Sequence, residues 1–150
     1  QKLNQLKGRA QPLSIIIESI DEISNYAEIN NNLLSELNAF FPGKYTALLN
    51  AIRNNLSPLI QNGSSKIGLR IPNHFFPLKL IKLLGKPIVT TSINRHGTKA
   101  LNDVTQIEID FPNIDIFEDS YHTPSKGSTI IDFSQSPYTI IRQGDSLFPL

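Results

Sequence analysis

Short apolar runs rich in β-branched residues alternate with runs of helical spacing through the middle of this 150-residue chain. Strand-like runs cover 12–17, 45–49 and 66–72, and helix-like runs separate them. Two further strand-like runs, 129–133 and 138–142, close the chain around a Ser-Gln-Ser-Pro turn. Elements in this order bury their apolar faces by packing helices against a sheet. The pattern predicts an α/β fold with a mixed, twisted sheet.

The remaining elements are predicted from residue spacing and from the residues that cap helices. Asn73 is the expected N-cap and Gly85 the expected C-cap of a helix that runs through Leu84, and Asn102 or Asp103 is expected to cap a short helix. The other expected elements are helical runs at 1–9, 20–29 and 32–41, one helical turn at 57–60, and strands at 88–92 and 114–117.

The composition indicates one folded domain. Its hydrophobic fraction of 39% and charged fraction of 18% are those of a globular chain, and no linker divides 1–150. The chain has no cysteine, which excludes a disulfide framework, a thiolate metal site and a cysteine nucleophile, and agrees with an expected cytoplasmic location. It starts at Gln1 and contains no methionine, so we expect a fragment of a longer protein.

The charge balance argues against two classes of partner. With 14 basic and 13 acidic residues the net charge is +1, so only a local patch could bind nucleic acid strongly. The longest apolar runs are too short to span a bilayer, and no signal peptide opens the chain, so we expect no membrane association.

The sequence offers little for a protein-held metal or a covalent intermediate. His74, His96 and His122 show no metal-ligand spacing, and the acidic residues at 115–119 are better explained as a solvated strand end than as a magnesium site. No phosphate-binding loop or nucleophile-elbow motif is present. An enzyme of this kind would work by holding reactive substrates together.

The segment Gly-Lys-Pro-Ile-Val-Thr-Thr-Ser-Ile-Asn-Arg-His-Gly, at 85–97, changes abruptly from apolar to polar. Ile88 and Val89 predict a short buried strand, after which Ser92 and Asn94 supply neutral donors and acceptors. Open α/β sheets bind ligands at the carboxyl ends of their strands, so we expect a site here.

Several basic and hydroxyl residues also fall at predicted element ends. Lys7 and Arg9 flank a glycine, Arg70 and Arg142 end strands, and Ser128 starts one. Each has an ordinary explanation, because basic residues complement helix dipoles and serines are common in turns. Together they indicate an anion-binding site, since arginine matches phosphate or carboxylate with paired hydrogen bonds.

Six short motifs occur in an order that resembles the YrdC-like family of threonylcarbamoyl-AMP synthases. They are Lys-Gly-Arg at 7–9, Pro-Gly-Lys-Tyr-Thr at 42–46, Arg-Ile-Pro at 70–72, Ser-Ile-Asn at 92–94, Ser-Thr-Ile at 128–130 and Arg-Gln-Gly at 142–144. The resemblance covers essentially the whole chain and implies a YrdC-like twisted, open, mixed sheet with flanking helices.

The resemblance implies a reaction that makes threonylcarbamoyl-AMP from L-threonine, bicarbonate and ATP, with magnesium arriving on the ATP. Partner proteins would then transfer the threonylcarbamoyl group to tRNA, and direct tRNA binding would be weak. The implied catalytic residues are Lys7 and Arg9. These two would also bind ATP, together with Ser92, Asn94 and Arg142, while Thr46, Arg70 and Ser128 would bind L-threonine.

The chain also departs from the family pattern. Ile93 replaces the usual alanine of Ser-Ala-Asn, which would crowd the site or point into the core. We expect the chain to lack the family's N-terminal strand-helix region, because its Pro-Thr-[Asp/Glu]-Thr stretch does not occur in these 150 residues. Three alternatives stay open: a YciO-like protein, an RNA-binding module, and a carbamoyl-transfer domain like that of hydrogenase-maturation proteins. Asn94 and the Lys7/Arg9 pair favour the synthase.

Overall fold

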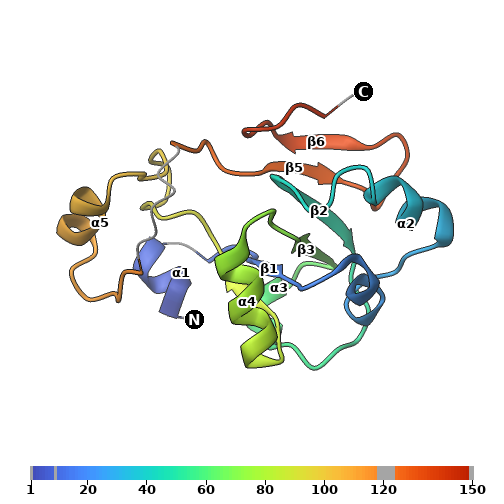
Figure 1. Ribbon diagram of the computed structural model, residues 1–150, viewed down its shortest axis with the longest axis horizontal. Helices are drawn as coiled ribbons and strands as arrows, with labels where there is room; N and C mark the ends of the chain where they lie inside the picture. Colours follow the sequence, from blue (N-terminus) through green and yellow to red (C-terminus); the bar gives the residue numbers. More distant parts are fainter. Residues whose placement is uncertain (1, 9, 118–123, 149–150) are drawn as a thin grey trace.

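The computed structural model describes residues 2–8, 10–117 and 124–148 (Figure 1). Its strands are β1 (Ser14–Ile16), β2 (Tyr45–Asn50), β3 (Lys66–Arg70), β4 (Ile88–Thr90), β5 (Thr129–Asp132) and β6 (Thr139–Arg142). Its helices are α1 (Lys2–Lys7), the 3-10 helix η1 (Ile20–Asn25), α2 (Asn31–Leu37), α3 (Pro58–Gln61), α4 (Phe75–Leu84) and α5 (Val104–Asp110).

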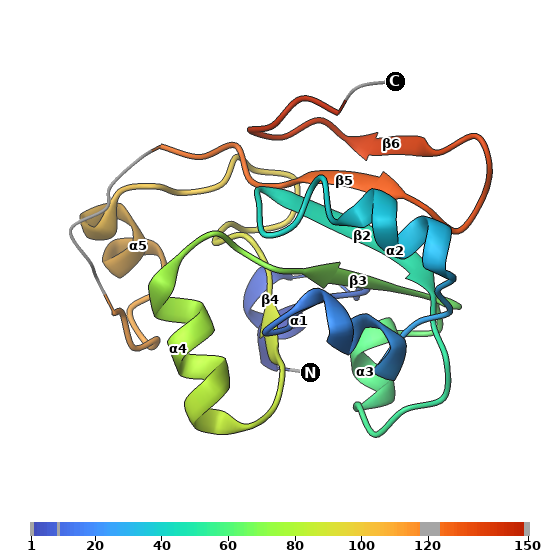
Figure 2. The same ribbon diagram turned by 45° about the vertical axis from the view of Figure 1, so that its right-hand side comes forward.

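The six strands form one sheet in the order β4-β1-β3-β2-β5-β6, as Figures 1 and 2 show. The pairs β1–β3 and β2–β5 are parallel, and the other three neighbouring pairs are antiparallel. The predicted mixed α/β sheet with flanking helices is therefore confirmed.

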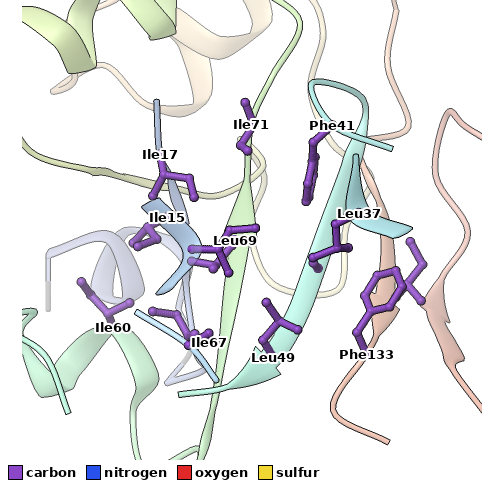
Figure 3. Close-up of a cluster of buried hydrophobic side chains, with 14 residues drawn as sticks. Ile15, Ile17, Leu37, Phe41, Leu49, Ile60, Ile67, Leu69, Ile71 and Phe133 are labelled. Atoms are coloured by element: carbon purple, nitrogen blue, oxygen red, sulfur yellow. The ribbon is translucent and has the colours of Figure 1, made fainter. Parts of the chain in front are cut away.

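The hydrophobic core lies on one face of this sheet (Figure 3). Alternate strand residues point to the same side, so Ile15, Leu69 and Leu49 share this face with the buried side chains of the helices. Ile23 of η1, Leu37 of α2 and the Ile60 side chain of α3 cover them. Each fully buried aliphatic side chain contributes about 1.5–3 kcal/mol, so this face holds the sheet and helices together.

Four local predictions were wrong. The helical run at 20–29 is only a short 3-10 helix, because Ala27 leaves it to pair with Ala51 beside the sheet. Residues 114–117 form no strand; Ile114 donates instead to the Phe111 carbonyl in a turn. The N-cap of α4 is His74 and not Asn73, because the His74 Nδ1 accepts the Phe76 amide at 3.2 Å.

The fourth error concerns β4. Ile88 and Val89 were expected in a buried strand, but all three residues of β4 are only half-buried. The reason is its place at the edge of the sheet, where β1 is its one strand neighbour. No helix in the described ranges is long and apolar enough to cross a membrane.

A half-buried ion pair joins β3 to β5 across β2, the strand between them. Lys66 Nζ lies 2.5 Å from Asp132 Oδ2, and Asp132 Oδ1 accepts the Ser134 hydroxyl at 2.6 Å and its amide at 3.0 Å. Burial raises the pKa of Asp132, but the hydrogen bonds from Lys66 and Ser134 and the Lys66 charge outweigh burial. The net effect is a pKa below the ordinary value of 3.8.

Replacing Asp132 with asparagine should therefore have an effect on stability that depends on pH. A carboxylate with a lowered folded-state pKa stabilises the fold above its unfolded pKa, and this contribution is lost as the pH falls below that value. We expect Asp132→Asn to cost about 1–3 kcal/mol at about pH 7 and much less below about pH 3. Urea unfolding at the two pH values measures the change in the free energy of unfolding, with the exposed Asp21→Asn variant as the control. An equal loss of stability at both pH values would contradict the prediction.

Candidate functional site

The face of the sheet opposite the core carries a polar pocket of about 220 Å³. Its walls come from the chain before β1, from all six strands, and from the segments next to β4 and β5. The lining residues are Gln11, Pro12, Leu13, Ser14, Thr46, Arg70, Thr90, Thr91, Ser92, Ser128, Ile130 and Arg142. Alternation along the strands explains this set, because Ser14, Thr46 and Arg70 are neighbours in sequence of core residues and point the other way.

Two arginines enter the pocket from the same end of the sheet. Ile130 of β5 pairs with Thr46 of β2 on one side and with Arg142 of β6 on the other. On β3, Leu69 pairs with Ala47, which follows Thr46, and Arg70 follows Leu69. Arg70 and Arg142 therefore lie in nearly one row across the strands. The Arg70 Nη1 donates to the Thr90 hydroxyl at 3.4 Å, while its buried Nε has no hydrogen-bond partner.

The charges of these arginines are not neutralised by contact. Among the described residues, neither guanidinium has a carboxylate within 4.0 Å; the ion pairs there are those of Lys44 and Lys66. Burial lowers the pKa of Arg70, and the charge of Arg142 lowers it further. Burial also lowers the pKa of Arg142, which the charge of Asp145 opposes. Two neighbouring like charges, the half-buried Arg70 and the more exposed Arg142, together with the unsatisfied Arg70 donor favour the binding of an anion.

A pair of hydroxyl groups lies beside the arginines. Thr46 Oγ1 and Ser128 Oγ are 2.7 Å apart, and both residues are buried. Arg142 donates to the Ser128 carbonyl from Nη2 at 2.7 Å and from Nε at 3.2 Å. These contacts fix the Arg142 side chain over the start of β5, with the two hydroxyls next to it.

Lys7 joins the Lys-Gly-Arg motif to the Ser-Ile-Asn motif, whose Ser92 lines the pocket. It ends α1 with only 5% of its surface exposed. Its Nζ donates to the Ser92 carbonyl at 2.6 Å, to the Ser92 hydroxyl at 3.3 Å and to Asn94 Oδ1. Ser92 also donates to Asn94 Oδ1 at 2.7 Å, and the Asn94 amide donates to the Thr98 carbonyl at 2.7 Å. Lys7 thereby fixes the polar segment that follows β4.

The structure brings most of the predicted site residues together. Of the eight, the five that line the pocket are Thr46, Arg70, Ser92, Ser128 and Arg142. Lys7 and Asn94 lie behind Ser92 and bond to it. Arg9 lies outside the described residues, so its place stays a prediction.

The expectation of a site at carboxyl strand ends was only partly right. Arg70 and Arg142 do end β3 and β6. Thr90 ends β4, however, and pairs with Ser14 at the start of β1, which lies toward the opposite end of the sheet. Because the sheet is mixed, the pocket spreads over its open face. Ile93 neither lines the pocket nor enters the core; its side chain is 40% exposed.

Sequence reasoning missed Ser14 as a pocket residue. The available signal was a polar side chain within the apolar strand 12–17, placed in register with Gly68. A Cβ on Gly68 would lie 2.5 Å from Ser14 Oγ and 3.3 Å from a Leu48 methyl group, so the bare glycine leaves room for the Ser14 side chain.

We expect Gly68→Ala to destabilise the fold by about 1–3 kcal/mol, as overpacking does. Adding Ser14→Gly should recover most of this loss, since it removes the nearest atom. Denaturant unfolding of both variants provides the measurement. Equal stability of the single and double variants would show that the Ser14 contact is not the cause.

Metal ligands are sparse. No group of three or more histidine, cysteine, aspartate or glutamate side chains in the described ranges could hold an ion. His122 and the acidic residues 118 and 119 fall outside these ranges, so the sequence-based prediction about them stays open.

Comparison with known proteins identifies the family. The profile of the Sua5, YciO and YrdC family, described as "Telomere recombination", matches residues 1–144. The chain belongs to this family. The expected resemblance is thus confirmed, and the family includes threonylcarbamoyl-AMP synthases as well as YciO-like proteins.

Three relatives show the range of similarity. The threonylcarbamoyl-AMP synthase of Rattus norvegicus is 29% identical over 95% of this chain and 54% of its own length. The P. abyssi Sua5 structure complexed with L-threonine is 28% identical, with a TM-score of 0.84 over 95% of this chain and 43% of that one. The E. coli YciO structure has a TM-score of 0.84 at 22% identity, over 95% and 71% of the two chains, and shows the shared fold.

This chain spans between 44% and 65% of the length of such curated relatives.

Proposed function

We propose that this chain forms the pocket of an L-threonylcarbamoyladenylate synthase, which serves threonylcarbamoyladenosine modification of tRNA. The observation that carries the proposal is the anion-binding pocket, where Arg70 and Arg142 meet paired hydroxyls and the Ser92 segment held by Lys7. Two findings on relatives support the proposal. The family includes threonylcarbamoyl-AMP synthases, and the structure of P. abyssi Sua5 has been solved in complex with L-threonine.

The proposed chemistry has two steps. The amino group of L-threonine attacks the carbon of bicarbonate, and loss of water leaves a carbamate. A carbamate oxygen then attacks the α-phosphorus of ATP, the bond from that phosphorus to the bridging oxygen breaks, and pyrophosphate leaves. Neither step needs a protein nucleophile; both need two anions held in line and the spreading phosphate charge stabilised.

The described residues suit these tasks. Arg70, with its unsatisfied Nε, would bind the threonine carboxylate, beside the hydroxyls of Thr46 and Ser128. Ser92 and Arg142 would contact ATP, with Asn94 fixing Ser92. Lys7 would hold this segment and favour the charge that develops on the phosphate, and Arg9 is proposed to help it. Magnesium would enter with ATP as part of the substrate.

The test is threonine-dependent adenylate formation. ATP, magnesium, labelled bicarbonate and L-threonine are supplied to this chain and to the longest reading frame that contains it, with L-serine as the control. Label in an adenylate with release of pyrophosphate supports the proposal. If neither protein forms it, the synthase function is wrong.

A YciO-like function without synthase activity is the second candidate. The observation in its favour is that E. coli YciO, at 23% identity, covers 87% of this chain. Binding of L-threonine or ATP without adenylate formation would favour it. An affinity for tRNA that falls steeply as the salt concentration rises would instead support an RNA-binding module. The slope of log affinity against log salt concentration depends on the number of phosphates that the protein contacts.

A further inference from the structure

The pocket has two halves carried by segments far apart in the sequence. One half is the Ser92–Asn94 segment held by Lys7, and the other is Ser128 with Arg142 at the β5–β6 end of the sheet. In the proposed reaction Ser92 of one half and Arg142 of the other half both contact ATP. Adenylate formation therefore needs the two halves at a fixed separation. Within the described residues, a chain of hydrogen bonds through Ser125 joins them.

Asn102 makes the first link of this chain. Its Oδ1 accepts the Ser125 amide at 2.9 Å and its Nδ2 donates to the Ser125 carbonyl at 3.2 Å, so the side chain brackets the Ser125 backbone. One residue earlier, the Leu101 amide donates to the Ile93 carbonyl at 2.8 Å. Asn102 is therefore connected to the Ser92–Asn94 half through the backbone of its neighbour Leu101.

Asp145 makes the second link. One carboxylate oxygen accepts the Ser125 hydroxyl at 2.6 Å, and the other accepts the Lys126 amide at 2.8 Å. The Asp145 amide donates to the Gly127 carbonyl at 2.9 Å. The side chain is 13% exposed, and Lys44 Nζ lies 3.7 Å away.

The segment that Asp145 holds lies against Arg142. Gly127 has a φ of 89°, and a Cβ there would lie 3.0 Å from Arg142 Nη2, so the guanidinium packs on the bare glycine. The same nitrogen donates to the carbonyl of Ser128. Moving residues 125–127 would therefore move the Arg142 side chain and the start of β5.

We propose that Asn102, Ser125 and Asp145 form a bridge that sets the distance between the two halves of the pocket. Asn102 and Asp145 are then positioning residues for adenylate formation, an inference that rests on the proposed function. Neither side chain lines the pocket, and both act through Ser125.

The experiment measures kcat and KM of the longest reading frame with Asp145→Ala, Asp145→Asn, Asn102→Ala and the double alanine variant. We expect Asp145→Ala to lower kcat about tenfold, because small misplacement of reacting groups is costly, with little change in KM for L-threonine. Asp145→Asn keeps one acceptor oxygen, so its kcat should fall less.

In the double alanine variant kcat should fall about as much as in the more affected single variant, because the effects of residues in one network are not additive. Exposed Asp21→Asn is the matched control and should behave as wild type.

Thermal unfolding of each variant distinguishes a loss of activity caused by misplaced site residues from one caused by unfolding. Wild-type kcat in folded Asp145→Ala, or a double variant whose losses multiply, would overturn the bridge. So would a fall in activity that only follows the fraction unfolded. An inactive wild-type protein would instead overturn the proposed function itself, so the two failures are distinct.

Discussion

The Lys7→Ala variant is expected to lose adenylate formation by about 10²–10³-fold in kcat, the effect of removing one preorganised donor from a transition state. The ammonium also holds Ser92 and Asn94, so its loss releases the segment after β4. Stopped or continuous assay of pyrophosphate release measures the change.

The same substitution removes the Lys7 donor from the half-buried Ser92 carbonyl, while Asn94 Oδ1 keeps the hydrogen bond from the Ser92 hydroxyl. We expect it to cost about 1–3 kcal/mol in the free energy of unfolding, so activity is compared at a temperature where the variant stays folded. Lys2→Ala is the matched control, because Lys2 lies in the same helix and is exposed. A folded Lys7→Ala protein with wild-type kcat would show that Lys7 only completes the end of α1.

Arg70→Ala should have opposite effects on activity and on stability. Loss of a charged hydrogen bond to the threonine carboxylate is worth about 3 kcal/mol, or about 100-fold in kcat/KM for L-threonine. Removing a half-buried cation that Arg142 repels should leave the melting temperature unchanged or higher. Steady-state kinetics and thermal unfolding measure the two effects.

The control for Arg70 is Arg53→Ala, which removes an exposed arginine from the loop after β2. It should change neither quantity. A clear fall in melting temperature in Arg70→Ala, with kcat/KM for L-threonine unaltered, would mean that Arg70 supports the fold and does not bind substrate.

The core face of the sheet was largely predictable from the sequence. Ile15 and Leu69 lie in runs whose apolar periodicity identifies strands, and Gly85 ends α4 as expected with a φ of 62°. The edge position of β4 was not predictable. Strand order depends on which strands pair, and the apolar run at Ile88 and Val89 has the same composition whether it lies inside or at an edge.

The sequence by itself determined the mixed α/β class, the family and most of the residue types in the pocket, because these follow from periodicity and from motifs in register. Only the tertiary structure decided that the site lies on the open face of the sheet. It also decided that Lys7 bonds to Ser92 and that Ser125 joins Asn102 to Asp145. These contacts link residues separated by 20 to 85 positions, and local spacing carries no information about such distances.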